Sequence, residues 1–454
     1  MKLHQIIGNT TKKILLWSLL LLVVLSPLPL GSNRPEFWNV ICFITATLGL
    51  LSLTQIKDFP LYNTPTKIAA AFCFATVIFI WLQTQQIYLP WQNSIWSKIE
   101  ISLPVTASRS ITIHPYLTFD ALTKYLSYII VFWCAMVTSR SRQTAWRMIE
   151  LVAYAGLLYA TYGIIEYFTG NSKILWHEKW AYHNSLTSVF VNRNTYATFT
   201  GMVALCATSV LWRLSYRLDG RPLRSVLFSE RRLFWRLYLM SLCLISNLAA
   251  LFLTHSRGGF LATAFGFTVF IGIVLAKQKR ISLSFLLGLI AVIIILSFSI
   301  IFSGEVTFAR LASTSFETSI RDDVYGSILE GVWASPILGW GFGTFEESFQ
   351  AFVSEKLGVY NWDKAHNTYL EVIFELGIIF GCFFFMPFIL ICQQFTRAVV
   401  NKRRKYMLPA LGISILGLSA VHALVDFSHQ IPAIAIFFSW IMGVTLTHSN
   451  PKKR

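Results

Sequence analysis

The sequence predicts an all-α membrane protein with about twelve transmembrane helices. The 454 residues are 55% hydrophobic and only 13% charged, with a mean hydropathy of +0.58. Apolar segments of about 20 residues, nearly free of charge, recur along the whole chain, and that length spans the hydrocarbon core of a bilayer. A soluble chain of this length needs far more polar surface to cover its core.

Each apolar segment is expected to form one helix. The first follows Lys12 and Lys13 and continues through Pro27 and Pro29 without a small-residue cleavage pattern, so we interpret it as a retained helix and not as a signal peptide. The expected helices are 14–31, 37–55, 66–84, 119–138, 148–168, 194–212, 234–254, 259–276, 281–303, 367–394, 406–424 and 431–448.

The distribution of charge predicts the orientation. Alternate connections, beginning with the N-terminus and ending with the C-terminal tail, hold 26 basic and 4 acidic residues, whereas the other connections hold 12 basic and 17 acidic residues. Lysine and arginine gather on the cytoplasmic side, so both termini are expected there. The net charge of +17 then lies against anionic lipids, above all in segment 213–236, and does not indicate nucleic-acid binding.

Two connections on the opposite, outer face are long, about 85–118 and 303–365. The second contains an apolar stripe with a spacing of four residues, which predicts an amphipathic helix resting on the membrane or on the helix bundle. The stripe is Ile320, Val324, Ile328 and Val332, and a similar pattern follows at Phe345, Phe349 and Phe352. We therefore expect helices one to nine in 1–303, a helical cap in 304–366, and helices ten to twelve with a cytoplasmic tail in 367–454.

Several motifs exclude other chemistry. The run Gly339-x-Gly341-x-Gly343 follows a predicted helix and lacks the six-position nucleotide fingerprint, so a turn with tight packing is expected. No Walker motif, HExxH or GxSxG is present. All seven cysteines lie inside apolar segments, so neither disulfides nor a metal site is predicted.

Charged residues at the outer ends of apolar helices are candidates for function, because charge is unfavourable there. Arg257 lies in a hairpin, where Gly258 and Gly259 leave room for a ligand or a helix to approach; alternatively, it extends to the membrane interface. Arg321 opens the first cap helix, where the alternative is a solvated helix start. His366 lies where the cap returns to a transmembrane helix, or it is an interface residue without a role.

Other candidates accompany these. Glu371 and Glu375 are four residues apart and share one helix face just after His366. Arg193 begins the sixth helix, and Asp426 joins the last two helices; capping and loop solvation are the alternatives for both.

This set of residues fits one kind of reaction. Arginine binds phosphate oxygens through a planar fork and keeps its proton, and histidine accepts a proton near neutral pH. Transfer of a sugar from a polyprenyl diphosphate needs both, since the leaving diphosphate develops negative charge and the attacking hydroxyl loses a proton. Such a donor is already activated, so no ATP is required.

The motifs together resemble the O-antigen ligase and polymerase family. They are Val191-Asn-Arg-Asn-Thr-Tyr-Ala197, His255-Ser-Arg-Gly-Gly259, Arg321 followed by Pro336-Ile-Leu-Gly-Trp-Gly341, and His366-Asn-Thr-Tyr-Leu-Glu371. The resemblance covers residues 192–381 in motif detail and the whole chain in helix count and loop placement. In the first five helices no residues can be matched to the family.

The resemblance implies a metal-independent, inverting glycosyltransferase of the bacterial inner membrane that needs no cofactor and acts at the periplasmic face. It implies that Arg257 and Arg321 hold the diphosphate of an undecaprenyl-linked glycan, and that His366 is the general base for the acceptor hydroxyl. Arg193, Asp426 and Glu371 are expected to support this site. The acceptor is lipid A–core in a ligase or a second lipid-linked glycan in a polymerase.

Three alternatives stay open. The single histidine favours a ligase slightly, but polymerases and ligases that act on proteins have the same predicted layout. A lipid-linked glycan transporter also has twelve helices, yet it usually shows two related halves and charges near the membrane midplane, which this sequence lacks. A non-catalytic subunit of an envelope assembly is the third alternative, and it predicts that the histidine and the arginines are dispensable.

Overall fold

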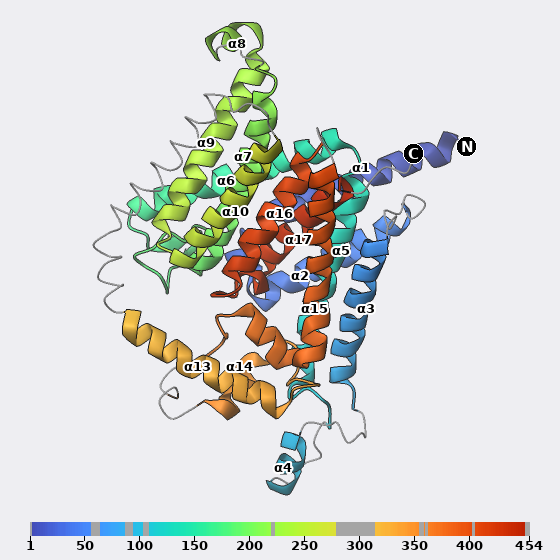
Figure 1. The fold of residues 1–454 in the computed structure, drawn as a ribbon, viewed down its shortest axis with the longest axis vertical. Coiled ribbons are helices and arrows are strands. Elements are labelled where there is room, and N and C mark those ends of the chain that lie inside the picture. The colour runs from blue at the N-terminus through green and yellow to red at the C-terminus, as the bar shows by residue number, and fades with distance from the viewer. Residues whose placement is uncertain are drawn as a thin grey trace.

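The computed structural model describes residues 2–55, 64–86, 94–102, 109–218, 223–277, 314–353, 358, 362–401 and 405–449. Within these ranges the protein is all-α and polytopic, as predicted (Figure 1). The helices are α1 (Lys2–Leu25), α2 (Pro35–Leu53), α3 (Thr64–Thr84), α4 (Ser94–Ser102), α5 (Pro115–Thr138), α6 (Arg142–Phe168), α7 (Arg193–Ser215), α8 (Leu223–Ser229), α9 (Arg231–Leu253), α10 (Arg257–Lys277), α13 (Thr314–Ala334), α14 (Phe345–Phe349), α15 (Thr368–Asn401), α16 (Met407–His422) and α17 (Pro432–Thr447).

Short elements complete the described fold. Three 3-10 turns are η1 (Leu30–Ser32), η3 (Gln350–Phe352) and η4 (Ser428–Gln430). Strands β1 (Lys173–Ile174) and β2 (His177–Glu178) pair antiparallel between α6 and α7. These strands were not predicted, because two residues are too few to show an alternating pattern.

Eleven predicted transmembrane helices correspond to helices of the structure, and the predicted helix 281–303 lies outside the described residues. Eight helices in the described ranges are long and apolar enough to cross a membrane, namely α2, α3, α5, α6, α7, α9, α10 and α15. The apolar helices α16 and α17 are shorter, at 16 residues each. The predicted boundaries mostly fall within a few residues of the observed ones.

Helix α7 lies in the core of the bundle and packs against α6, α9, α10 and α16. Small residues allow this close approach: a Cβ added to Gly201 would meet the side chain of Thr263 in α10, and one added to Gly156 in α6 would meet Val203. Such packing is typical of helices in membranes, where van der Waals contact replaces the hydrophobic effect. The core therefore fixes the position of the first residues of α7.

Helices α13 and α14 lie across the end of the bundle that is remote from α8 (Figure 1). Val324, Ile328 and Val332 of the predicted stripe are buried against Phe345 and Phe374. The sequence predicted that the stripe rests on the membrane or on the helix bundle. This part of it packs on protein, against α14 and α15. The division of the chain at 303 and 366 stays a prediction.

The glycine run forms the predicted turn and is tightly packed. Gly339, Gly341 and Gly343 have φ of +67°, +118° and +80°. The backbone N–H of Gly341 donates to the carbonyl of Glu375 at 3.0 Å, and that carbonyl is accessible because Gly377 interrupts α15 with φ of +72°. Buried backbone groups need such partners.

Replacing Gly341 by alanine is expected to destabilise the protein by about 2 kcal/mol or more, because the added Cβ meets the Thr112 side chain at a φ that disfavours L-residues. Gly326→Ala is the matched control: no atom lies near its added Cβ, and alanine is preferred over glycine in a helix such as α13. The thermal unfolding midpoint, measured in one detergent, should fall for Gly341→Ala and stay level or rise for Gly326→Ala. Equal midpoints would contradict the packing described for the turn.

Candidate functional site

Asn194 joins three segments at the end of the bundle near α13. It lies in the first turn of α7, and its side-chain nitrogen donates to a carboxylate oxygen of Asp426 at 2.9 Å. Its side-chain oxygen accepts a hydrogen bond from the Ser256 hydroxyl at 2.7 Å. Ser256 directly precedes α10, and the buried Asp426 lies between α16 and η4. One amide group therefore holds the starts of α7 and α10 and the Asp426 loop together.

The starts of three helices meet at this place. Asn192 caps α7, Ser256 caps α10 and Asn367 caps α15, with N–H···O distances of 2.7, 3.2 and 3.1 Å. The Thr368 hydroxyl, at the start of α15, donates to the backbone oxygen of Asp426 at 2.9 Å. Each helix N-terminus carries about half a positive charge, so the shared region favours an anion.

Two predicted site arginines stand at these helix starts. Arg193 is the first residue of α7, and its guanidinium carbon lies 5.4 Å from the centre of the Tyr182 ring. Arg257 is the first residue of α10, and its side chain is exposed. The helix dipole repels a cation at an N-terminus, so both positions are unfavourable for the helices themselves. Both are well placed to add charge to an anion site.

His366 lies two residues before α15, beside the same loop. Its ring is 5.1 Å from the ring of Phe427, the neighbour of Asp426, in an edge-to-face contact. The φ of His366 is +50°, in the left-handed region that few non-glycine residues adopt. Among the described residues, none forms a hydrogen bond with its half-buried ring, which leaves both ring nitrogens available to a substrate.

Glu371 positions the chain that leads to His366. Its carboxylate accepts a hydrogen bond from the backbone N–H of Ala365 at 3.0 Å and lies 3.6 Å from the Lys364 ammonium. Burial lowers the pKa of Lys364, but the neighbouring carboxylates, Glu371 first, raise it by more, so this pKa is raised overall. Glu371 and Glu375 are both buried, on the shared face that the sequence predicted.

His429 lies in the same loop as Asp426, but its environment differs from that of His366. Burial lowers the pKa of His429 to about 4, and its ring packs edge-on against Phe438 at 5.0 Å. His429 is therefore neutral near pH 7 and binds a proton weakly, which makes it a poor general base. Of these two histidines, His366 is therefore the better candidate for the general base.

His422 is part of the cluster and was missed in the sequence. It is the last residue of α16, it is buried, and its Nδ1 lies 2.6 Å from the Thr198 hydroxyl. A Cβ added to Gly258 would lie 3.3 Å from His422 Nε2. The glycines after Arg257 therefore allow the end of α16 to approach closely, which is one of the two roles predicted for them. A single histidine at the end of an apolar segment carries no motif that could have revealed it.

The connection between α6 and α7 is held in place by a second residue that sequence reasoning missed. The Lys179 ammonium is buried and donates to the side-chain oxygen of Asn171 at 2.8 Å and to the carbonyl of Ser185 at 2.7 Å. Burial lowers the pKa of Lys179 to about 8. The Ser185 hydroxyl lies 3.5 Å from His255 Nδ1, so this connection closes over the start of α10.

The predicted site residues fall into three groups. Arg193, Arg257, His366 and Asp426 come from segments that hydrogen bonds and ring contacts join into one region. Glu371 supports that region from α15. Arg321 belongs to α13, but its side chain lies outside the described part of the structure, so its contact with a diphosphate stays a prediction. In the described ranges no three histidine, cysteine or acidic side chains gather as around a metal ion.

Asn194→Ala is expected to lower the free energy of unfolding by about 2 kcal/mol, because the buried Asp426 carboxylate and the Ser256 hydroxyl each lose a partner. Activity should fall as well, since the helix starts lose their common tie. Asn184→Ala, at an exposed position in the preceding connection, is the control and should leave both unchanged. Thermal unfolding and a glycan-transfer assay measure the two effects. An unchanged midpoint for Asn194→Ala would show that the tie is dispensable.

Comparison with known proteins agrees with the motifs. Residues 242–386 match the family model described as O-antigen ligase. This matched segment includes Arg257, Arg321, His366 and Glu371. Arg193 and Asp426 lie outside the matched segment and reach it through Asn194. A search of curated proteins gives no match. The similarity to the O-antigen ligase family is therefore established over residues 242–386 of this chain.

Proposed function

We propose that this protein is a glycosyltransferase that moves a glycan from undecaprenyl diphosphate to an acceptor hydroxyl at the periplasmic face of the bacterial inner membrane. The observation that carries the proposal is the meeting of three helix N-termini: Arg193 and Arg257 begin two of these helices, and His366 lies just before the third. A diphosphate is the anion that such a site fits, because arginine forks and helix N-termini both bind phosphate oxygens.

In the proposed reaction His366 accepts the proton of the acceptor hydroxyl, whose oxygen attacks the anomeric carbon of the donor glycan. The bond between that carbon and the diphosphate oxygen breaks, and the electron pair stays on the polyprenyl diphosphate. Arg257 and Arg321 bind this leaving group, with support from Arg193, and stabilise the negative charge that develops. Direct displacement inverts the configuration at the anomeric carbon.

Asp426 and Glu371 do not touch the reacting atoms in this proposal. Asp426 orients the starts of α7 and α15 through its contacts with Asn194 and Thr368. Glu371 holds the backbone at Ala365, next to His366. Both are positioning residues, and small displacements of a base from its substrate lower the rate strongly.

We propose the ligase reaction, in which the acceptor is a hydroxyl of lipid A–core. The family model that matches is described as O-antigen ligase, and in the loop region of the candidate site His366 suits a base better than His429 does. A polymerase that joins two lipid-linked repeat units is the alternative, since the donor chemistry is the same.

The surface glycan of a strain that lacks this protein tests the proposal. A gel that separates the glycan by size should show bare core, while lipid-linked polymer accumulates, and the wild-type gene should restore the long chains. Core that bears a single repeat unit would indicate a polymerase instead. An unchanged pattern would overturn the assignment to this glycan, and purified protein that moves a lipid-linked oligosaccharide across liposomes without joining it to an acceptor would indicate a transporter.

A further inference from the structure

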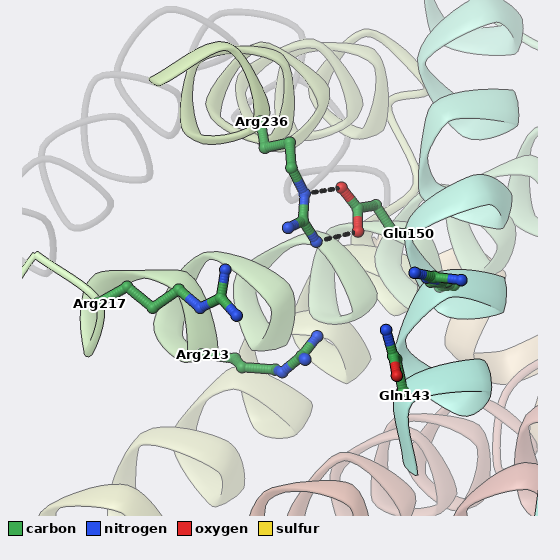
Figure 2. Close-up of a pocket in the computed structure, with 6 residues that line it drawn as sticks. Gln143, Glu150, Arg213, Arg217 and Arg236 are labelled. Carbon is green, nitrogen blue, oxygen red and sulfur yellow. Dashed lines mark hydrogen bonds and ion pairs between the residues drawn. The ribbon is translucent and has the colours of Figure 1, made fainter. Parts of the chain in front are cut away.

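A cavity lined mainly by arginines lies at the other end of the bundle. It has a volume of about 340 Å³ and is formed by the start of α6, the end of α7 and the start of α9 (Figure 2). Its lining residues are Gln143, Arg147, Glu150, Arg213, Arg217 and Arg236. Four guanidinium groups thus surround one carboxylate, and the cavity has an excess of positive charge.

One side of this arginine cavity has a fixed geometry. Arg236 donates from Nε and Nη2 to the two oxygens of the buried Glu150 carboxylate, at 2.7 and 2.5 Å. The Tyr154 hydroxyl donates to the same carboxylate at 3.0 Å. Glu150 is the one acidic residue among the lining residues and is bound to Arg236, so the lining has more positive than negative charge. Arg213 and Arg217 extend into the space beside the Glu150–Arg236 pair (Figure 2).

Arg213 is also held in place. Its guanidinium carbon lies 5.2 Å from the centre of the Trp146 ring in α6, so the side chain rests on an aromatic face. Arg217 lies in the turn that follows α7 and lines the same cavity. The guanidinium donors of the cavity come from α6, α7 and α9 and converge on one space, whereas charges on a solvated surface point away from one another.

A second cavity of about 630 Å³ shares Arg147 and Glu150 with the first and runs between α1 and α6. Lys12 and Lys13 are among its lining residues, and its walls are largely apolar. The apolar residues of this groove include Leu16, Trp17, Leu20, Met148 and Leu151. A cationic pocket and an apolar groove between two helices are thus neighbours, with Arg147 and Glu150 in the lining of both.

We propose that these two cavities bind one anionic phospholipid, with its phosphate among the arginines and an acyl chain in the groove between α1 and α6. Guanidinium forks bind phosphate oxygens, and basic pockets between transmembrane helices on the cytoplasmic side suit anionic head groups. A zwitterionic lipid fits less well, because its ammonium group meets the same positive excess. The site is separate from the candidate glycan site, since it lies at the opposite ends of α7 and α9.

Binding to the purified full-length protein in detergent tests the proposal, with phosphatidylglycerol and phosphatidylethanolamine as probes and native mass spectrometry as the readout. Phosphatidylglycerol should bind the more tightly, and the double variant Arg213→Gln, Arg217→Gln should weaken it about tenfold or more. This variant keeps the Glu150–Arg236 pair. The control is Arg231→Gln with Arg232→Gln, which removes equal charge at exposed positions outside the cavity and should leave affinity unchanged.

A second variant separates a lipid from a free anion. Leu151→Trp fills the groove without changing charge and should weaken phosphatidylglycerol binding, whereas inorganic diphosphate should not displace the lipid at matched concentration. If the Arg213–Arg217 variant and the Arg231–Arg232 control lost affinity for phosphatidylglycerol equally, binding would depend on overall charge and not on this cavity, and the proposal would be overturned. Displacement by diphosphate together with normal binding by Leu151→Trp would also overturn it, in favour of a soluble phosphate ligand.

Discussion

His366→Ala should lower the rate of glycan transfer by about 100-fold or more, while the protein inserts and folds as the wild type does. The imidazole is held beside the Asp426 loop by its contact with Phe427, and the hydroxyl that attacks must lose a proton. His429 and His422, which lie close to the Asp426 loop, do not replace it readily, because burial lowers the pKa of His429 to about 4 and His422 already contacts Thr198. The measurement is the initial rate with purified protein, lipid-linked donor and acceptor.

The control for this prediction is His183→Ala. His183 is exposed in the connection before α7 and contributes its backbone carbonyl, not its ring, to the Asn171 contact. Its removal should leave the rate unchanged, and both variants should have the thermal unfolding midpoint of the wild type. A normal rate for His366→Ala would end its assignment as general base and favour the non-catalytic subunit.

Helix positions could be predicted from the sequence because a bilayer demands about 20 apolar residues for each span, and that length is visible in the residues themselves. The turn at Gly339, Gly341 and Gly343 was also predictable, since glycines spaced by two have few other uses after a helix. The partners of this turn were not predictable. The Glu375 carbonyl, which accepts the N–H of Gly341, becomes accessible only where Gly377 interrupts α15, and no local pattern links positions 341 and 375.

The candidate site shows the same limit. Arg257 and His366 stood out because charge at the end of an apolar helix is unfavourable and calls for a reason. Asn194, Ser256 and Thr368 did not stand out, because small polar residues are common in and beside the first turn of a helix. Their second role, joining α7 and α10 to the Asp426 loop, depends on which helices pack together. Packing between helices far apart in sequence leaves almost no trace in either segment.

The two ends of the bundle use arginine in different ways. At the start of α10, Arg257 is exposed and opposes the helix dipole, so its charge is available to a ligand that arrives and leaves. Near the start of α9, Arg236 is bound to the buried Glu150 carboxylate, so it fixes the geometry of the arginine cavity. A fixed guanidinium suits a resident ligand such as a lipid, whereas an exposed one suits a substrate that turns over.

Arg257→Lys is expected to lower the rate of transfer about tenfold, and Arg257→Gln about 100-fold or more. Lysine keeps the charge at the start of α10 but lacks the fork that binds two phosphate oxygens at once, so the diphosphate is held less well as it leaves. Arg34→Lys is the control, because Arg34 is also exposed in a connection on the predicted outer face, and its guanidinium carbon lies 5.6 Å from the centre of the Trp180 ring. Its rate should stay level. If Arg257→Lys kept full activity, Arg257 would not bind the diphosphate through its fork; equal losses in the lysine and glutamine variants would instead show that the fork, and not the charge, carries the effect.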